Sequence, residues 1–528
     1  MRAFGPRVAR GLLVAVPLGF LAIFFLWPVG AILGRGLRTG GSLDLRSLAE
    51  VWRDPSLRHV LWFTVVQAVL STIATLAVAL PATAVLSRFQ FRGRGLVIAL
   101  LTMPFVLPTV VVGTAFRSLG LSGSLTAIIT AHVFFNVAIA VRVVGEAWRA
   151  LDPAEEDAAQ SLGAGPILTF TAVTLPALRP AIVAASSIVF LFCFTSFGVI
   201  LILGGPRFAT IETEIYRQTA QLLDLHTAAA LSIVQLVAVV AALLVAGAMT
   251  SRVRTSTRLP VRRPPPTSRR SQLLLALGLL PATVLVTVPL GDLVIRSLAN
   301  GAAGYSHLTS TPIGAPGSPL QAIATSIKVA CVATVIAVAL GLALAHALTR
   351  PGRRVGIARV AELLVLLPLG VSAVTVGFGF LIVFDTPPLD LRTSWWIIPI
   401  AHALVALPFV VRTTVPVLRA IDPRQRETAA MLGAGPAQVW RTVDLPIVAH
   451  AAKVAAGFAA AISLGEFGAT LFIVRPETTT VPVAIYRFLS RPGVTNVDQA
   501  MALATILMVL TGVVAVVAER GSRIEARS

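Results

Sequence analysis

Five polar residues interrupt otherwise apolar segments, and they are the residues that could do chemistry inside a membrane. His132 and Asn136 lie one helical turn apart, His402 lies in a second apolar run, and Ser196 and Glu466 follow two further runs. Polar groups within membrane spans are expensive, so each is a candidate for a polar pathway. The alternative is structural. The histidines would then hydrogen-bond between packed helices, and Glu466 would lie at a cytoplasmic helix end.

No residue pattern for catalysis stands out in the chain. A P-loop requires Gly-x-x-x-x-Gly-Lys-Ser/Thr, whereas the two lysines, Lys328 and Lys453, follow isoleucine and alanine. The sequence also shows no recognisable metal-ligand cluster and no nucleophile–base pair. We therefore expect a protein that is not an enzyme and binds no cofactor or metal itself.

The most informative stretch is polar, lies between long apolar segments and occurs twice. Asp152-Pro153 predicts an N-cap followed by proline at the first helical position. Gly163-Ala164-Gly165-Pro166 then predicts the end of that helix. Asp422 repeats Asp152, and Gly433 repeats Gly163, because 422 − 152 and 433 − 163 both equal 270. A short helix pair of this kind, placed between membrane spans, predicts a surface that docks on a partner.

Both stretches resemble the coupling-loop signature of the membrane subunits of bacterial ATP-binding-cassette (ABC) importers. That signature is Glu-Ala-Ala, three residues, Gly, nine residues and Ile-x-Leu-Pro. This chain departs from it by Asp for Glu in the first copy, Thr for Ala in the second, and Val for Ile in both. The resemblance implies that each short helix sits in a cleft of a separate ATPase subunit and transmits its closure to the pore. The matched residues are Asp157, Ala158, Ala159, Gly163, Leu175 and Pro176 in the first loop, and Glu427, Thr428, Ala429, Gly433, Leu445 and Pro446 in the second.

The composition predicts an all-α polytopic membrane protein. Hydrophobic residues make up 56% of the chain and charged residues 12%, against about 45–50% and 25% in soluble domains. The net charge of +20 comes from arginines in short loops, which the positive-inside rule explains without a nucleic-acid partner. Spans need about 20 apolar residues. We predict 12 spans in two sets of six: 11–33, 60–86, 96–118, 125–145, 181–203 and 226–249, then 272–296, 322–348, 358–383, 395–415, 451–474 and 499–518.

The spans divide the chain into two halves joined by a linker. We expect a first permease half over 1–250, a basic, proline-rich cytoplasmic linker over 251–271 and a second permease half over 272–528. Arginine bias places both coupling loops, 146–180 and 416–450, and both chain termini on the cytoplasmic side of a bacterial inner membrane. The linker is a semi-extended tether, although its arginines also suit contact with membrane lipid headgroups.

Matches at the same offset extend beyond the coupling loops. His132 corresponds to His402, and Phe197-Gly198 to Phe467-Gly468. Because each half has an even number of spans, we predict two parallel six-helix repeats, with the pore on the axis that relates them. Tyr216 and its counterpart are expected to be interfacial anchors. Prolines predict helices that are either broken or bent at three positions: Pro104, Pro108 and Pro368.

The whole chain resembles the thiamine and ferric-iron branch of these importers, in which both membrane halves are fused. Ala131–Asn136 and Phe192–Gly198 look closest to thiamine permeases, whereas Ser463–Gly468 is shared with ferric-iron relatives. The resemblance implies two copies of a cytoplasmic ATPase that binds ATP and Mg²⁺, and an extracytoplasmic solute-binding protein. It also implies thiamine or ferric iron as the solute.

A second class, the proton-coupled secondary transporters, can also have two six-span halves. In that alternative His132, His402 and Glu466 would carry protons through the membrane. It explains the span count, but it leaves the repeated coupling loop unexplained.

Overall fold

The computed structural model shows a helical protein. It describes residues 6–39, 42–43, 45–205, 207–250, 268–311, 317–349, 362, 364–365 and 367–524. Within these ranges the strands are limited to β1 (Arg38–Thr39) and β2 (Ser42–Leu43), which pair antiparallel with Arg38 opposite Leu43. The predicted linker lies outside the described residues except for its last four, where the next long helix begins.

The elements of the first half are long apolar helices separated by short ones. They are α1 (Pro6–Leu21), the π-helix η1 (Ala22–Leu26), α2 (Trp27–Leu37), α3 (Arg46–Arg53), α4 (Pro55–Arg88), α5 (Arg94–Thr102), the 3-10 helix η2 (Met103–Val106), α6 (Thr109–Ser118), α7 (Leu125–Arg149), α8 (Pro153–Ser161), α9 (Pro166–Thr169), the π-helix η3 (Phe170–Thr174), α10 (Leu175–Phe194), α11 (Gly198–Leu203), α12 (Ile211–Ala220) and α13 (Leu225–Thr250).

The second half follows a similar order. Its described elements are α14 (Arg269–Ser297), α15 (Ala299–Ser306), α16 (Pro319–Thr349), the 3-10 helix η4 (Leu367–Gly370), α18 (Ala373–Val383), α19 (Ile397–Ala420), α20 (Pro423–Met431), α21 (Pro436–Val439), the π-helix η5 (Trp440–Asp444), α22 (Leu445–Gly465), α23 (Gly468–Ile473), the 3-10 helix η6 (Pro476–Thr478), α24 (Val481–Leu489) and α25 (Val494–Ile524). The elements α8, α9, η3 and α11 have counterparts in α20, α21, η5 and α23, with both bounds shifted by 270 residues.

Ten helices of the described chain are long and apolar enough to cross a membrane. An eleventh span results if the bent pair Arg94–Val106 and Thr109–Ser118 counts as one. The predicted span 358–383 falls partly outside the described residues, and its described part contains η4 and the 11-residue α18. The multi-pass helical class is therefore confirmed, while the count of twelve stays a prediction.

Proline breaks and polar caps interrupt the apolar segments. The two helices on either side of Leu107-Pro108 are bent by 106°, and Pro368 lies in the 3-10 helix η4. The predicted spans 181–203 and 451–474 each end too late, because α10 ends at Phe194 and α22 ends at Gly465. After each break a new six-residue helix, α11 or α23, begins.

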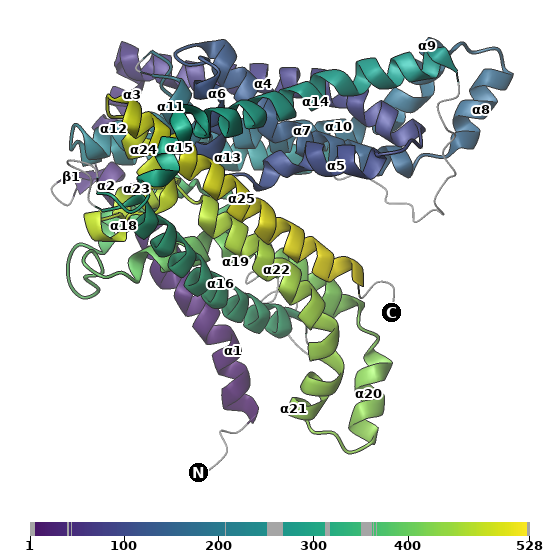
Figure 1. Ribbon diagram of the computed structural model, residues 1–528. Coiled ribbons are helices and arrows are strands. Elements are labelled where there is room, and N and C mark those ends of the chain that lie inside the picture. Colours follow the sequence, from purple (N-terminus) through teal and green to yellow (C-terminus); the bar gives the residue numbers. More distant parts are fainter. Residues whose placement is uncertain are drawn as a thin grey trace.

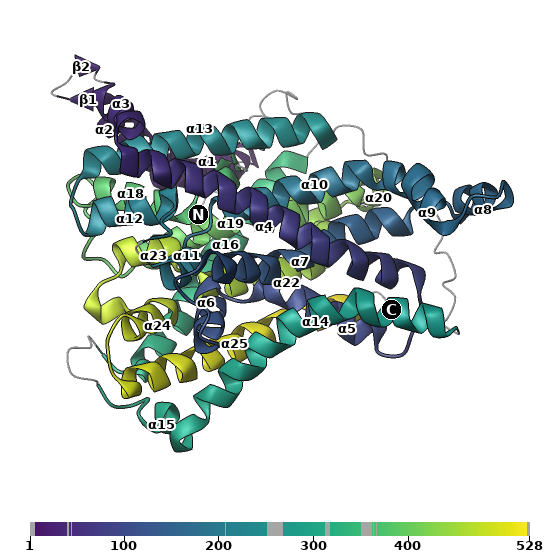
Figure 2. The same ribbon diagram turned by 90° about the horizontal axis from the view of Figure 1, so that it is seen from above.

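The first helix of each half packs against the other half. α1 contacts α16, and α2 contacts α18, while α14 packs against α4, α5 and α6. The predicted halves 1–250 and 272–528 are thus interlocked in space. Figures 1 and 2 both show α11, α12, α18, α23 and α24 gathered at one end of the molecule.

The long helices spread into two groups away from that shared end. In Figure 1 the helices that carry α8 and α9 point to one tip, and those that carry α20 and α21 point to another. The two predicted coupling loops consequently lie apart, whereas the opposite ends of the two groups meet.

Candidate functional site

The coupling loops have the local structure that their sequence predicts. The Asp152 carboxylate accepts the backbone N–H of Ala154 at 3.1 Å, and Asp422 accepts that of Arg424 at 2.9 Å, so both aspartates cap their helices. Gly163 and Gly433 both have φ +88°, a left-handed conformation that glycine adopts without strain. Each helix therefore ends in a tight turn at its predicted glycine.

The two loops also present their matched residues in nearly the same way. Asp157, Ala158 and Gly163 are exposed, and Ala159 is half-buried. Their counterparts follow the same order of exposure: Glu427, Thr428 and Gly433 exposed, Ala429 half-buried. The Leu-Pro pairs differ slightly, since Leu175 and Pro176 are half-buried while Leu445 and Pro446 are exposed.

Apolar side chains at the loop tips are functional candidates that the sequence reasoning missed. Leu162 is 90% exposed and Leu432, its counterpart at offset 270, is 84% exposed. Met431 and Ile167 also project from the tips, at 81% and 80% exposure. Exposed apolar groups gathered on an otherwise polar helix pair make each tip a candidate interaction surface. The available signal was a leucine directly before the glycine in both copies.

A polar contact behind each tip fixes the short helix to the long one that follows. In the first loop Glu156 on α8 accepts a hydrogen bond from Thr174 and pairs with Arg88 at 3.1 Å. In the second loop Arg426 donates to Asp444 at 2.7 Å. Positions 156 and 174 correspond to positions 426 and 444 at offset 270. The same pair of positions is therefore in contact in both halves, through glutamate and threonine in the first half and through arginine and aspartate in the second. Each contact therefore links the short helix at the tip to the segment that directly precedes its long helix.

His132 joins three segments of the first half. Its Nδ1 hydrogen-bonds Ser71 on α4 at 3.0 Å, and its Nε2 hydrogen-bonds Ser196 at 2.9 Å. Asn136 donates to the His132 carbonyl at 2.9 Å and to Cys193 Sγ at 3.4 Å. The His132 and Asn136 side chains are 2% and 3% exposed and thus buried. All of their hydrogen-bond partners belong to the first half.

His402 is also hydrogen-bonded through both ring nitrogens, but to other partners, and a carboxylate takes the position of Ser196. Its Nδ1 hydrogen-bonds Ser463 at 2.7 Å, and its Nε2 lies 2.8 Å from Thr470 Oγ1 and 3.3 Å from Glu466 Oε2. Glu466 also accepts the backbone N–H of Ala469 at 2.8 Å and of Thr470 at 3.0 Å. Glu466 therefore caps α23, which explains why α22 ends before it.

The structure brings the five predicted pathway residues into two networks, one per half. His132, Asn136 and Ser196 form the first, and His402 and Glu466 belong to the second. Four of the five side chains are buried, and Ser196 is half-buried. Satisfied hydrogen bonds between packed helices account for these residues in the present conformation, while contact with a solute stays a prediction. Within the described residues no group of three His, Cys, Asp or Glu side chains is arranged to hold a metal ion.

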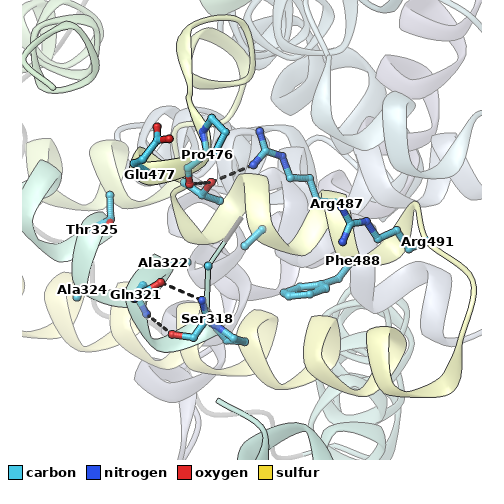
Figure 3. A pocket seen from close by; sticks show the side chains of 14 residues that line it. Ser318, Gln321, Ala322, Ala324, Thr325, Pro476, Glu477, Arg487, Phe488 and Arg491 are labelled. Atoms are coloured by element: carbon cyan, nitrogen blue, oxygen red, sulfur yellow. Dashed lines mark hydrogen bonds between the residues drawn. The ribbon is translucent and has the colours of Figure 1, made fainter. Parts of the chain in front are cut away.

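Two cavities lie at the end opposite the coupling loops. One of about 490 Å³ opens between the start of α16, η6 and α24, where Arg487, Arg491 and Glu477 line it (Figure 3). The other, of about 530 Å³, has Arg207 and Arg217 in its wall. Arg487 and Arg217 are equivalent positions at offset 270, and so are Glu477 and Arg207. The cavities are therefore corresponding surfaces of the two halves.

The cavity arginines are held in place by neighbouring groups. Arg487 donates to Thr479 Oγ1 at 2.9 Å, and Arg217 forms two hydrogen bonds of 2.8 Å with the Glu214 carboxylate. These hydrogen bonds raise the pKa of Arg217 above its ordinary value. The Arg217 charge is offset by Glu214 in the same wall, but each wall contains two arginines and one glutamate, so both walls carry a net positive charge.

Interlocked apolar halves and repeated coupling-type loops are typical of a membrane permease. Known proteins agree with this class. The chain is 30% identical to the thiamine transport system permease protein ThiP of Brucella abortus, over 96% of this chain and 95% of that protein. It is 26% identical to the ThiP protein of Salmonella typhimurium, over 91% and 89%, and 25% identical to a probable ABC transporter permease of Sinorhizobium fredii, over 94% of each. No protein-family model matches the chain.

The chain accordingly belongs to the permease subunits of ABC importers, in the fused two-half type that includes the thiamine permeases. It is a transporter subunit. Its relatives are named as transport system permeases and not as proton-coupled secondary transporters.

Proposed function

We propose that the chain is the permease of an ATP-driven thiamine importer and forms the thiamine pathway across the membrane. The observation that carries this proposal is the 30% identity to a thiamine permease over almost the full length of both proteins. Ferric iron is the second candidate from the sequence, because Ser463–Gly468 is shared with ferric-iron relatives. The names of several relatives favour thiamine.

The two coupling loops are proposed to bind two copies of a cytoplasmic ATPase, one copy to each loop. The exposed tips at Leu162 and Leu432 support this assignment, because they offer two similar apolar surfaces at separate tips of the molecule. The ATP and Mg²⁺ would be held by the ATPase and not by this chain. Closure of the ATPase pair would draw the tips together, and the Glu156 and Arg426 contacts would carry that motion into α10 and α22.

The halves are proposed to form two parallel six-helix repeats about an axis through the membrane. The shared offset of 270 between α8–α11 and α20–α23 supports this arrangement, since repeats with an even number of spans keep one orientation. Arginine bias then sets the coupling loops and both termini in the cytoplasm of a bacterial cell, with the chain in its inner membrane.

An extracytoplasmic thiamine-binding protein is proposed to dock on the end where the halves meet. The paired cavities support that surface, because each wall contains two arginines and one glutamate, with Arg487 and Arg217 at equivalent positions. A two-lobed binding protein with acidic residues on both lobes would match two corresponding positive sites.

The test is purification of the tagged chain from its native membrane, followed by mass spectrometry and an ATPase assay. The proposal expects a P-loop ATPase in about two copies and a binding protein that retains thiamine. A binding protein that retains ferric iron would overturn the thiamine assignment, while the ABC class would stand. If the chain purifies without any ATPase from cells that express an ATPase subunit, the coupling assignment is contradicted.

A further inference from the structure

Two phenylalanines at equivalent positions of the halves stack on each other. Phe197 follows α10 and Phe467 follows α22, and 467 − 197 is again 270. Their ring centroids are 5.6 Å apart, with an angle of 26° between the ring planes. When two equivalent residues of a repeat touch, the axis that relates the repeats must pass between them. The stacked pair therefore marks the proposed axis of the permease.

Two tyrosines complete this contact as a second equivalent pair. Tyr216 on α12 packs edge-on against Phe197, with centroids 5.8 Å apart, and Tyr486 on α24 packs against Phe467 at 5.6 Å. The two tyrosines thus flank the stacked phenylalanines, one from each half. Both are partly buried, and their role as interfacial anchors stays a prediction. We call these four side chains the axial aromatic cluster.

The axial aromatic cluster leaves no space along the axis at its level. Phe197 is 7% exposed and Phe467 is 2% exposed. A Cβ atom added at Gly198 would lie 3.3 Å from Phe467 Cδ1 and 3.1 Å from Thr109 Cβ. Even one methyl group would be crowded there, so a solute cannot pass while the rings stay stacked.

A polar contact between the halves closes the same end of the molecule. Ser372, the N-cap residue of α18, donates to the Glu212 carboxylate on α12 at 3.0 Å. Glu212 is fully buried, and Gln235 on α13 donates to its second oxygen. The halves are thus joined at the end with the aromatic cluster, whereas Figure 1 shows the coupling loops apart at the other end.

We infer that Phe197, Phe467, Tyr216 and Tyr486 form the gate that closes the solute pathway at the end opposite the coupling loops. The inference rests on the proposed permease function and on the parallel repeat. Rocking of the two halves that draws the coupling loops together separates the stacked rings. The ring faces uncovered by this motion are electron-rich, and they suit a solute that is both aromatic and positively charged.

The first test measures the gate without reference to the solute. Phe197→Cys and Phe467→Cys are combined in a background where Cys193 and Cys331 are replaced by serine and alanine, respectively. The complex with ATPase and binding protein is treated with a short bifunctional thiol reagent, either free of nucleotide or trapped with ATP and vanadate. We expect efficient cross-linking without nucleotide and a several-fold lower yield in the trapped complex.

A matched control uses a stacked pair inside one half. Phe190 and Phe194 on α10 have centroids 5.7 Å apart at an angle of 28°, and cysteines there should cross-link equally in both states. Equal yields for the 197–467 pair across the two states would overturn the gate. If the wild-type complex imports no thiamine but the 197–467 yield still falls with ATP, the solute assignment is wrong and the gate stands.

The second test separates closure from recognition. Replacing both phenylalanines by leucine keeps an apolar plug but removes the ring faces, so we expect tight vesicles and a several-fold slower uptake of thiamine. Replacing both by alanine opens a gap, so accumulated thiamine should leak out without ATP. Uptake at the wild-type rate by the leucine pair would contradict recognition by the rings. Full retention of thiamine by the alanine pair, in protein of normal thermal stability, would contradict the gate.

Discussion

Truncation of Leu162 to alanine is the perturbation that tests the coupling surface most sharply. The side chain is 90% exposed, so the substitution removes almost no contact within the permease and should leave its stability unchanged. A bound ATPase would bury the three carbon atoms that alanine lacks. At about 0.8 kcal/mol per buried carbon this amounts to roughly 2 kcal/mol. Such a loss weakens binding by about 30-fold.

The assay is a titration of the ATPase against detergent-solubilised permease, with Leu432→Ala measured in parallel for the second loop. Leu223, 76% exposed in the turn between α12 and α13 near the opposite end, provides the matched control. Its alanine variant should bind the ATPase like the wild type. Wild-type affinity in both Leu162→Ala and Leu432→Ala would refute the assignment of the tips as ATPase contacts. A loss of affinity accompanied by a lower melting temperature would contradict the claim that the tip serves only the partner.

Three further predictions concern residues that act within the permease. Gly163→Val should reduce ATP-driven uptake, because a β-branched residue at φ +88° is strained by about 1–2 kcal/mol. The control variant Gly163→Asn should retain most uptake, and equal uptake by the two variants would contradict this prediction. Arg426→Ala should expose the second coupling loop to limited proteolysis, since Asp444 then loses its 2.7 Å partner at a cost of about 1–3 kcal/mol, and an unchanged digestion pattern would argue against the contact. Glu466→Ala should lower the melting temperature of the solubilised protein, because two backbone N–H groups at the start of α23 lose their acceptor; normal stability with altered solute preference would instead support a pathway role.

Features set by neighbouring residues were predictable from the sequence. Asp152 caps α8, Gly163 ends it, and Pro108 separates two bent helices, as expected from the preferences of these residue types. The offset of 270 extended the Asp152 and Gly163 assignments to Asp422 and Gly433 in the second half. Apolar length alone also identified the multi-pass class, because a span needs about 20 apolar residues wherever it lies in the chain.

Features set by distant residues were not predictable in the same way. Phe197 and Phe467 stack on each other although 270 residues separate them. Helix α14 of the second half packs on α4 of the first, so the two halves are not separate units in space. The span ending near 474 looked continuous because Glu466 carries no local sign that it caps a new helix. The partners of His132 likewise come from α4 and from the residues after α10, and only the fold brings them together.

Uptake of labelled thiamine into proteoliposomes tests the central claim most directly. The vesicles would contain this permease and its ATPase, with the binding protein added outside and ATP enclosed. We predict that thiamine accumulates in the vesicles only when both ATP and the binding protein are present. Unlabelled thiamine should compete with the labelled thiamine, and ferric ion should have no effect. Accumulation of ferric iron in place of thiamine, or thiamine uptake driven by a proton gradient without the ATPase, would contradict it.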